Sequence, residues 1–176
     1  MIESATTPLH VGLRMLRPSA LGILLLSSLT AGCADAGGES ALDARIADLE
    51  DRFTPGLHTL MGEVGQRHAM LWFAGDAENW PLADYQLHEI EELIENIESL
   101  HPVYDGVPVA ELLTETTRPP LDAVEAAVDA GDVVGFRQAF DGLTQGCNSC
   151  HIASDRAALA IVRPTAPPVT NLDFSP

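Results

Sequence analysis

The sequence predicts an all-α protein, an antiparallel four-helix bundle followed by an extended C-terminal tail. Four stretches carry apolar residues at intervals of three and four, the spacing that gives a helix one apolar face for a shared core. Short connections rich in glycine and proline separate these stretches, and short connections favour antiparallel neighbours. We expect the bundle at residues 54–163. The tail, which is rich in proline and has no periodicity, is expected at residues 164–176.

The residues before the bundle resemble an export signal and a tether. Residues 1–32 carry arginines, then a short apolar run, then small residues, which is typical of a signal sequence; the run is too short for an ordinary membrane span. The five residues that end at Cys33 resemble a bacterial lipobox, which implies that Cys33 is lipidated. Ordinary signal cleavage is the alternative. Residues 33–53 should form a tether and a short helix, because Leu42, Ile46 and Leu49 recur at helical spacing.

The first two bundle helices have recognisable starts. The Thr54-Pro55 pair predicts a helix to about Ala74, with threonine as the cap and proline in the first turn. Trp80 should open the second helix, which ends near His101. The apolar face of the first helix carries Leu57, Leu60, Met61, Val64, His68, Leu71 and Trp72, and that of the second carries Ala83, Leu87, Ile90, Ile94 and Ile97.

The third and fourth helical segments follow. The third, at residues 108–130, is expected to break at Pro119-Pro120, because proline disrupts a helix interior. Asp132 should cap the fourth helix, which we expect to continue until Pro164 ends it. One face of this last helix carries Phe136, Phe140, Leu143, Cys147 and Cys150.

Two cysteines stand three residues apart near the C-terminus, with a histidine directly after the second. Cys147, Cys150 and His151 form the attachment signature of a c-type haem. The two thiols add to the vinyl groups on one porphyrin edge, and the next residue lies under the iron, where imidazole is a good axial ligand. A thioredoxin-like pair would need a βαβ context, and structural zinc would need further Cys or His ligands nearby. The sequence shows neither and predicts one covalent haem c, with a chance match as the remaining alternative.

The charge of the chain is strongly acidic. It has 26 acidic and 9 basic residues, for a formal net charge of −17, and every basic residue is arginine. This balance disfavours nucleic acid and anionic lipid as partners. An acidic surface would steer a basic redox partner protein, or it is simply a solvated surface. We expect contact with a membrane only through the lipid at Cys33. The sequence also allows a homodimer.

A chain whose last bundle helix carries the haem motif resembles the cytochrome c′ family, the class II monohaem cytochromes. The resemblance covers the architecture of about residues 54–163 and, in motif, only the five residues at the haem. Members of that family usually carry arginine four residues after the haem histidine. This chain has Asp155 there and Arg156 one position later. The resemblance therefore does not imply an open coordination site of the c′ type.

A more specific likeness is to a group of small exported monohaem lipoproteins. These proteins carry segments similar to residues 68–75, to Asn79-Trp80 and to residues 82–85, ahead of a Cys-Asn-x-Cys-His motif. This resemblance implies export and one covalent haem.

The sixth iron ligand is expected from the first helix. Its start should lie beside the end of the fourth helix. If the fourth helix runs to Pro164, His151 lies about 11 residues, or roughly 16 Å, before its end, at the level of Gly65. His68 is then the first candidate for the distal ligand, and Met61 is the second, because both lie on the apolar face. The alternatives are a hydrogen-bonded core role for His68, an open iron, or another ligand. Gly65 would let a flat ring approach the backbone.

These features favour a membrane-tethered, periplasm-facing monohaem cytochrome that transfers electrons and is not an enzyme. The alternative is binding or sensing of nitric oxide or carbon monoxide at an open or displaceable distal site. A peroxidase-like enzyme is the weakest possibility, because no distal acid–base pair is evident beyond Arg67 and His68. Ala34 is not the aspartate that usually retains lipoproteins at the inner membrane, which favours the outer membrane.

Overall fold

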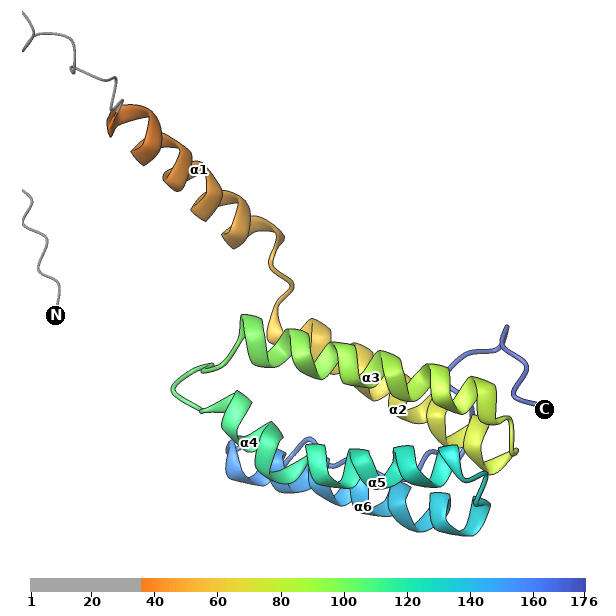
Figure 1. Cartoon of the computed structure of the whole chain (residues 1–176). Coiled ribbons are helices and arrows are strands. Elements are labelled where there is room, and N and C mark those ends of the chain that lie inside the picture. The colour runs from red at the N-terminus through yellow and green to blue at the C-terminus, as the bar shows by residue number, and fades with distance from the viewer. Residues whose placement is uncertain (1–35) are drawn as a thin grey trace, which may run out of the picture. The chain divides into compact units, whose positions relative to one another are not determined.

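The computed structural model describes residues 36–176, which form six α-helices and contain no β-strand (Figure 1). The predicted signal sequence and Cys33 lie outside these residues. The all-α prediction is confirmed, and the arrangement is compatible with a helical bundle. None of the helices in this part of the chain is long and apolar enough to cross a membrane. The helices are α1 (Ala36–Phe53), α2 (Leu57–Asp76), α3 (Trp80–Leu100), α4 (Val109–Thr116), α5 (Arg118–Asp129) and α6 (Val133–Ala153).

The contacts divide the chain into two units, with the boundary between Leu49 and Glu50 near the end of α1. Among α2 to α6, α2 packs along α3, and α5 packs along α6, as the two pairs in Figure 1 show. Smaller contacts join α2 to α6, α3 to α4 and α5, and α4 to α5 and α6. Large apolar side chains fill the space that these helices share. The most fully buried include Phe136, Phe140, Leu71, Leu87, Ile90, Ile94, Ile97, Leu121 and Leu143.

Side-chain caps begin two of the helices where the sequence predicts them. Asn79 caps α3 by accepting a hydrogen bond from the Leu82 N–H at 3.3 Å. Asp132 caps α6 by accepting from the N–H groups of Val134 and Gly135 at 3.1 and 3.0 Å. Both caps satisfy amide donors that have no partner inside the helix. The predicted starts of α3 and α6 are therefore confirmed.

The predicted cap of the first bundle helix is wrong. The Thr54 N–H donates to the Glu50 carbonyl at 2.9 Å, so this residue completes the last turn of α1. Pro55 and Gly56 follow outside any helix, and α2 begins at Leu57 without a side-chain cap. The helix before Thr54 begins at Ala36.

The break predicted in the third segment is confirmed. Only Thr117 separates α4 from α5, and Pro119 and Pro120 lie in the first turn of α5. Proline is tolerated there because the first amide groups of a helix have no acceptor within the helix. The break at Thr117 gives two short helices, α4 and α5, and both pack against α6.

The predicted length of the last helix is wrong, because α6 ends at Ala153 instead of near Pro164. Asp155 adopts a left-handed conformation with φ of 58°. Its N–H donates to the Ile152 carbonyl at 3.1 Å, and the Arg156 N–H donates to the His151 carbonyl at 2.7 Å. This pair of bonds is the Schellman motif, which stops a helix and turns the chain. Residues 154–163 then form a non-helical segment, called here the strap.

The C-terminal tail, residues 164–176, contains no helix and no strand. The Phe174 ring lies 5.7 Å from the Phe73 ring, between centroids, and is half-buried. The side-chain amide of Asn79 donates to the Ser175 carbonyl at 2.7 Å. The end of the tail is thus held against α2 and the start of α3.

Replacement of Gly146 by alanine should destabilise the protein by about 1–3 kcal/mol, the usual cost of overpacking. A Cβ at this position would overlap the Thr116 carbonyl oxygen and lie 3.0 Å from Pro120 Cγ, so backbone would have to move. Chemical denaturation measures the free energy of unfolding.

Gly142→Ala on the same helix is the matched control. A Cβ there would meet only Pro120 Cβ at an ordinary 3.9 Å. It should be neutral or stabilise by up to about 1 kcal/mol, because alanine is the better helix former. Equal stability of the two variants would contradict the close approach at Gly146.

Candidate functional site

The three residues of the cysteine–histidine motif lie in the last two turns of α6. Cys147 and Cys150 are three residues apart and therefore lie on one face of the helix. Both are free thiols; Cys150 is buried and Cys147 is half-buried. His151 follows directly and is half-buried. The helix thus presents two thiols and one imidazole together at its C-terminal end.

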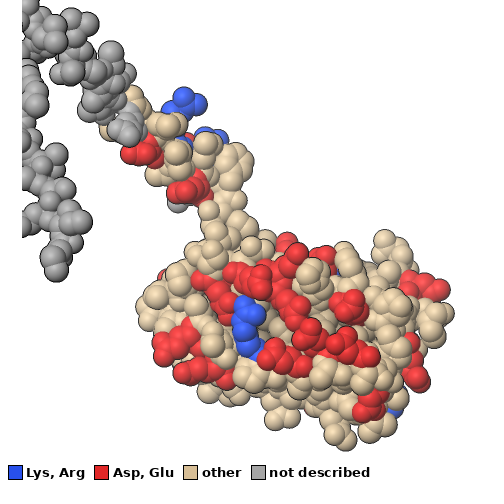
Figure 2. Space-filling view, in the orientation of Figure 1, with Lys and Arg blue, Asp and Glu red and all other residues tan. Residues whose placement is uncertain are grey.

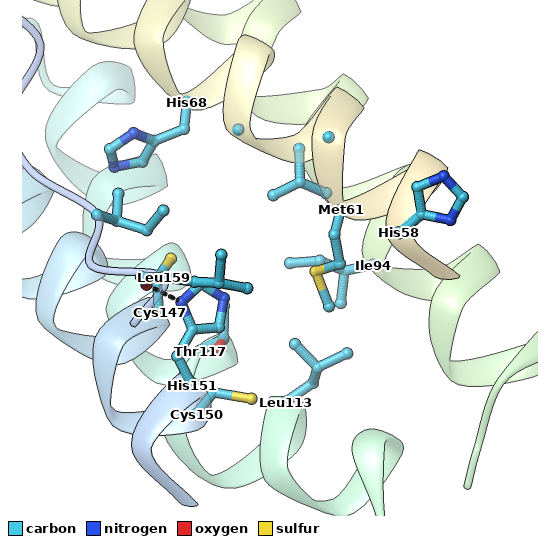
Figure 3. A pocket seen from close by; sticks show the side chains of 14 residues that line it. His58, Met61, His68, Ile94, Leu113, Thr117, Cys147, Cys150, His151 and Leu159 are labelled. Carbon is cyan, nitrogen blue, oxygen red and sulfur yellow. Dashed lines mark hydrogen bonds between the residues drawn. The ribbon is translucent and has the colours of Figure 1, made fainter. Parts of the chain in front are cut away.

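These side chains open onto an apolar cavity of about 370 Å³ between α2 and α6 (Figure 3). The cavity wall also includes side chains from α3 and α4, the linking residue Thr117, and the strap. Both predicted distal candidates line the same cavity as the motif. The lining residues are His58, Met61, Gly62, Val64, Gly65, His68, Ile94, Leu113, Thr117, Cys147, Cys150, His151, Leu159 and Ile161.

A second hollow of about 290 Å³ adjoins the first one. Its polar residues include Asp105, Ser154 and Arg156, of which Arg156 carries positive charge and pairs with Asp105 at 3.6 Å. The two hollows meet at the motif, because they share the lining residues His58, Met61, Cys150, His151 and Leu159. Together they leave an extended apolar space with one charged edge.

The imidazole of His151 is oriented by the strap. Its Nδ1 lies 2.6 Å from the backbone carbonyl oxygen of Leu159. A carbonyl oxygen can only accept, so Nδ1 carries the proton and donates. The Nε2 lone pair is then available to a metal, and the hydrogen bond to Nδ1 fixes the tautomer and makes the imidazole a more basic ligand.

The strap is clamped by a residue inside the motif. The Asn148 side-chain amide donates to the Ile161 carbonyl at 2.9 Å, and its oxygen accepts from the Ile161 N–H at 2.8 Å. These two bonds hold the strap beside α6, where the Leu159 carbonyl meets His151. Sequence analysis missed the roles of Asn148 and Leu159. The apolar residues near position 160 match a helix, and no local pattern shows that an amide side chain captures them.

Two glycines form part of the α2 wall of the cavity. Gly62 and Gly65 both line it, and a Cβ added at either position would meet no atom within 4 Å. The helix therefore presents bare backbone to an open space, which suits a flat ring. The predicted level of His151 relied on the wrong end for α6, but Gly65 does lie on this wall.

His68 is already hydrogen-bonded. Its Nε2 lies 3.0 Å from the Thr144 hydroxyl, and that hydroxyl donates to the Phe140 carbonyl at 2.9 Å. The single hydroxyl proton is used, so Nε2 is the donor to Thr144. The ring is buried and lies 4.3 Å from the Phe140 ring, and burial lowers the pKa of His68 to about 4. This contact favours the core role that the sequence allows for His68.

Met61 lies in a different setting. Its side chain is half-buried, lines both hollows, and points from α2 into the space beside His151 (Figure 3). A thioether needs no hydrogen bond, so nothing in its surroundings competes for the sulfur. His58 also borders both hollows, but its ring is exposed and lies on the side of α2 away from His151 (Figure 3).

The two motif thiols are unlike those of a redox-active pair. Burial raises the pKa of Cys147 to about 11, and the neighbouring Cys150 adds to the shift; burial also raises the pKa of Cys150. Reactive Cys-x-x-Cys pairs instead have a lowered thiol pKa. Within residues 36–176, no three His, Cys, Asp or Glu side chains are grouped to hold a metal ion.

Comparison of the chain with protein-family models, with curated proteins and with solved structures finds no significant match.

Asn148→Ala should release the strap while leaving α6 intact. It removes both bonds to Ile161, and two hydrogen bonds contribute about 1–3 kcal/mol together. Amide exchange at Ile161 should become roughly ten-fold faster or more, measured by hydrogen–deuterium exchange with residue resolution.

Ser149→Ala is the control, since Ser149 is the other middle residue of the motif and bonds only within α6, to the Gln145 carbonyl. It should leave exchange at Ile161 unchanged. Equal exchange in the two variants would show that Asn148 does not hold the strap.

Proposed function

We propose that the chain is a monohaem c-type cytochrome, and that α2 to α6 form an antiparallel four-helix bundle whose last helix carries the haem. In this proposal α4 and α5 together count as the third helix. One observation carries the proposal. Two thiols on one helical face and an imidazole with its Nε2 free all open onto the same apolar, glycine-walled cavity.

The residues present fit the cofactor. Cys147 and Cys150 would hold haem c through thioether bonds, and His151 Nε2 would be the proximal ligand. The bound group would supply a one-electron couple at its iron. The Leu159 carbonyl holds the His151 proton at Nδ1, the apolar lining offers few partners to water, and Arg156 at the charged edge would be available to the cofactor's carboxylates.

For the sixth ligand we propose Met61 ahead of His68. Met61 borders both hollows together with His151, whereas His68 borders only the first. Ligation by His68 Nε2 would also break its bond to Thr144. A six-coordinate iron with a thioether ligand suits electron transfer at a raised reduction potential.

The proposed setting is the periplasmic side of a membrane, with the chain tethered by a lipid on Cys33. Acidic side chains spread over the face that carries α3 (Figure 2), and the chain has a net charge of −17. Such a surface attracts positively charged proteins and speeds their encounter. We therefore propose a basic redox protein as the partner.

Mass spectrometry of the protein produced with its export signal tests the attachments. One covalent haem should be present, and it should be lost or greatly reduced in Cys147→Ser/Cys150→Ser. A lipid adduct should be lost in Cys33→Ser, which should retain the haem. Absence of covalent haem from the wild-type protein would refute the proposed function.

Optical spectra of the haem-loaded protein test the sixth ligand. The reduced wild type should be low-spin with a sharp α band that carbon monoxide does not change. Met61→Leu should become high-spin and bind carbon monoxide, because leucine keeps the volume but cannot ligate iron. His68→Gln should stay low-spin, because it leaves the proposed ligand Met61 in place. Glutamine also retains a donor for the Thr144 hydroxyl, so the surrounding core is preserved.

The opposite pattern, with an open iron only in His68→Gln, would make His68 the ligand. A wild-type spectrum that is high-spin and shifts with carbon monoxide would instead favour the binding of diatomic gases.

A further inference from the structure

Helix α1 carries an apolar stripe that the proposed haem site does not use. Leu42, Ile46, Leu49 and Phe53 follow one another at intervals of four, three and four residues. Their side chains are 57%, 44%, 49% and 72% exposed, respectively. A helix that leaves every large apolar side chain in water has a face that is suited to a partner.

The spacing of this stripe is that of a coiled-coil seam. Ile46 and Phe53 occupy the a positions of a heptad repeat, and Leu42 and Leu49 occupy the d positions. A β-branched residue at a combined with leucine at d favours a parallel pair of helices. The stripe therefore favours a two-stranded parallel arrangement, with Ile46 at its centre.

The charges beside the seam point to a second copy of the same chain. Arg45 occupies a g position, and Glu50 occupies the next e position, five residues later; both are exposed. In a parallel pair, each g residue faces the following e residue of the other helix. Arg45 of each copy would then face Glu50 of the other, twice by symmetry. An antiparallel pair that buries the whole seam would instead bring like charges together, Arg45 near Arg52 and Glu50 near Asp43 of the other copy.

A membrane surface fits this helix less well. Helices that lie on membranes usually carry lysine and arginine beside their apolar face. The polar side of α1 instead carries the acidic residues Asp43, Asp48 and Glu50 against the basic residues Arg45 and Arg52. Anionic lipid would repel this side.

We propose that α1 is a self-association helix that pairs in parallel with α1 of a second copy. Leu42, Ile46, Leu49 and Phe53 form the seam, and Arg45 and Glu50 set the orientation. The seam spans only about two heptads, so the pairing is weak and depends on concentration. It rests on neither the haem nor the lipid, although a lipid tether would raise the local concentration of the chain.

Analytical ultracentrifugation of the full chain, kept in mild detergent so that any lipid is retained, tests the proposal. The wild type should approach a dimer as concentration rises. Leu42→Ser/Leu49→Ser should weaken self-association by at least ten-fold. Ala44→Ser/Ala47→Ser introduces two serines on the opposite face of α1 and should change self-association little. A monomeric wild type, or a dimer that the seam variant leaves intact, would overturn the proposal.

Charge exchange tests the partner and the orientation. Arg45→Glu alone and Glu50→Arg alone should each weaken self-association, because each places like charges across the seam. An equimolar mixture of the two variants should form the mixed dimer, and Arg45→Glu/Glu50→Arg in one chain should restore self-association. No recovery in either case would overturn the parallel pairing. Seam-dependent binding to zwitterionic vesicles by a monomer would identify a membrane helix instead.

Discussion

The hydrogen bond from His151 Nδ1 to the Leu159 carbonyl is the contact on which the rest of the site depends. It joins His151, near the end of α6, to Leu159 in the strap, eight residues later in the chain. Three local features make it form: the left-handed turn at Asp155 stops the helix, the strap returns along α6, and Asn148 fixes the strap at Ile161. Because this bond keeps the proton on Nδ1, the lone pair of Nε2 is available to a metal.

The two ends of α2 differ in packing, close at one end and open at the other. Near the loop between α2 and α3, the Trp72 ring lies 6.2 Å from Phe136 and 5.1 Å from Phe140, and Gly75 lets Phe136 approach the α2 backbone. Toward the other end of α2, Gly62 and Gly65 meet no atom where a Cβ would be. Glycine thus serves two purposes on one helix, to admit an aromatic side chain at one end and to leave room for a flat group at the other.

Local signals predicted much of this arrangement from the sequence. The start of α3 at Trp80 was predicted, the Asp132 cap predicted the start of α6, and Pro119-Pro120 predicted the break before α5. The motif spacing placed Cys147, Cys150 and His151 on one helical face. The end of α6 was missed because an aspartate takes the left-handed position that usually belongs to glycine. The partner of His68 was missed because Thr144 is 76 residues away, and periodicity carries no information about such pairs.

The strap also separates the anchoring of a metal-binding imidazole from the adjustment of its electronic character. In the proposed cytochrome the covalent and coordinating atoms would belong to α6, whereas the acceptor for the Nδ1 proton belongs to the strap, beyond the turn at Asp155 that ends the helix. Substitutions in the strap beyond the helix-ending turn, at residues 157–163, can therefore shift the basicity of His151, and with it the reduction potential of an iron held there, while the helices stay as they are. If the proposed haem is present, this loop would be a place where the driving force of electron exchange can vary during evolution without a new fold.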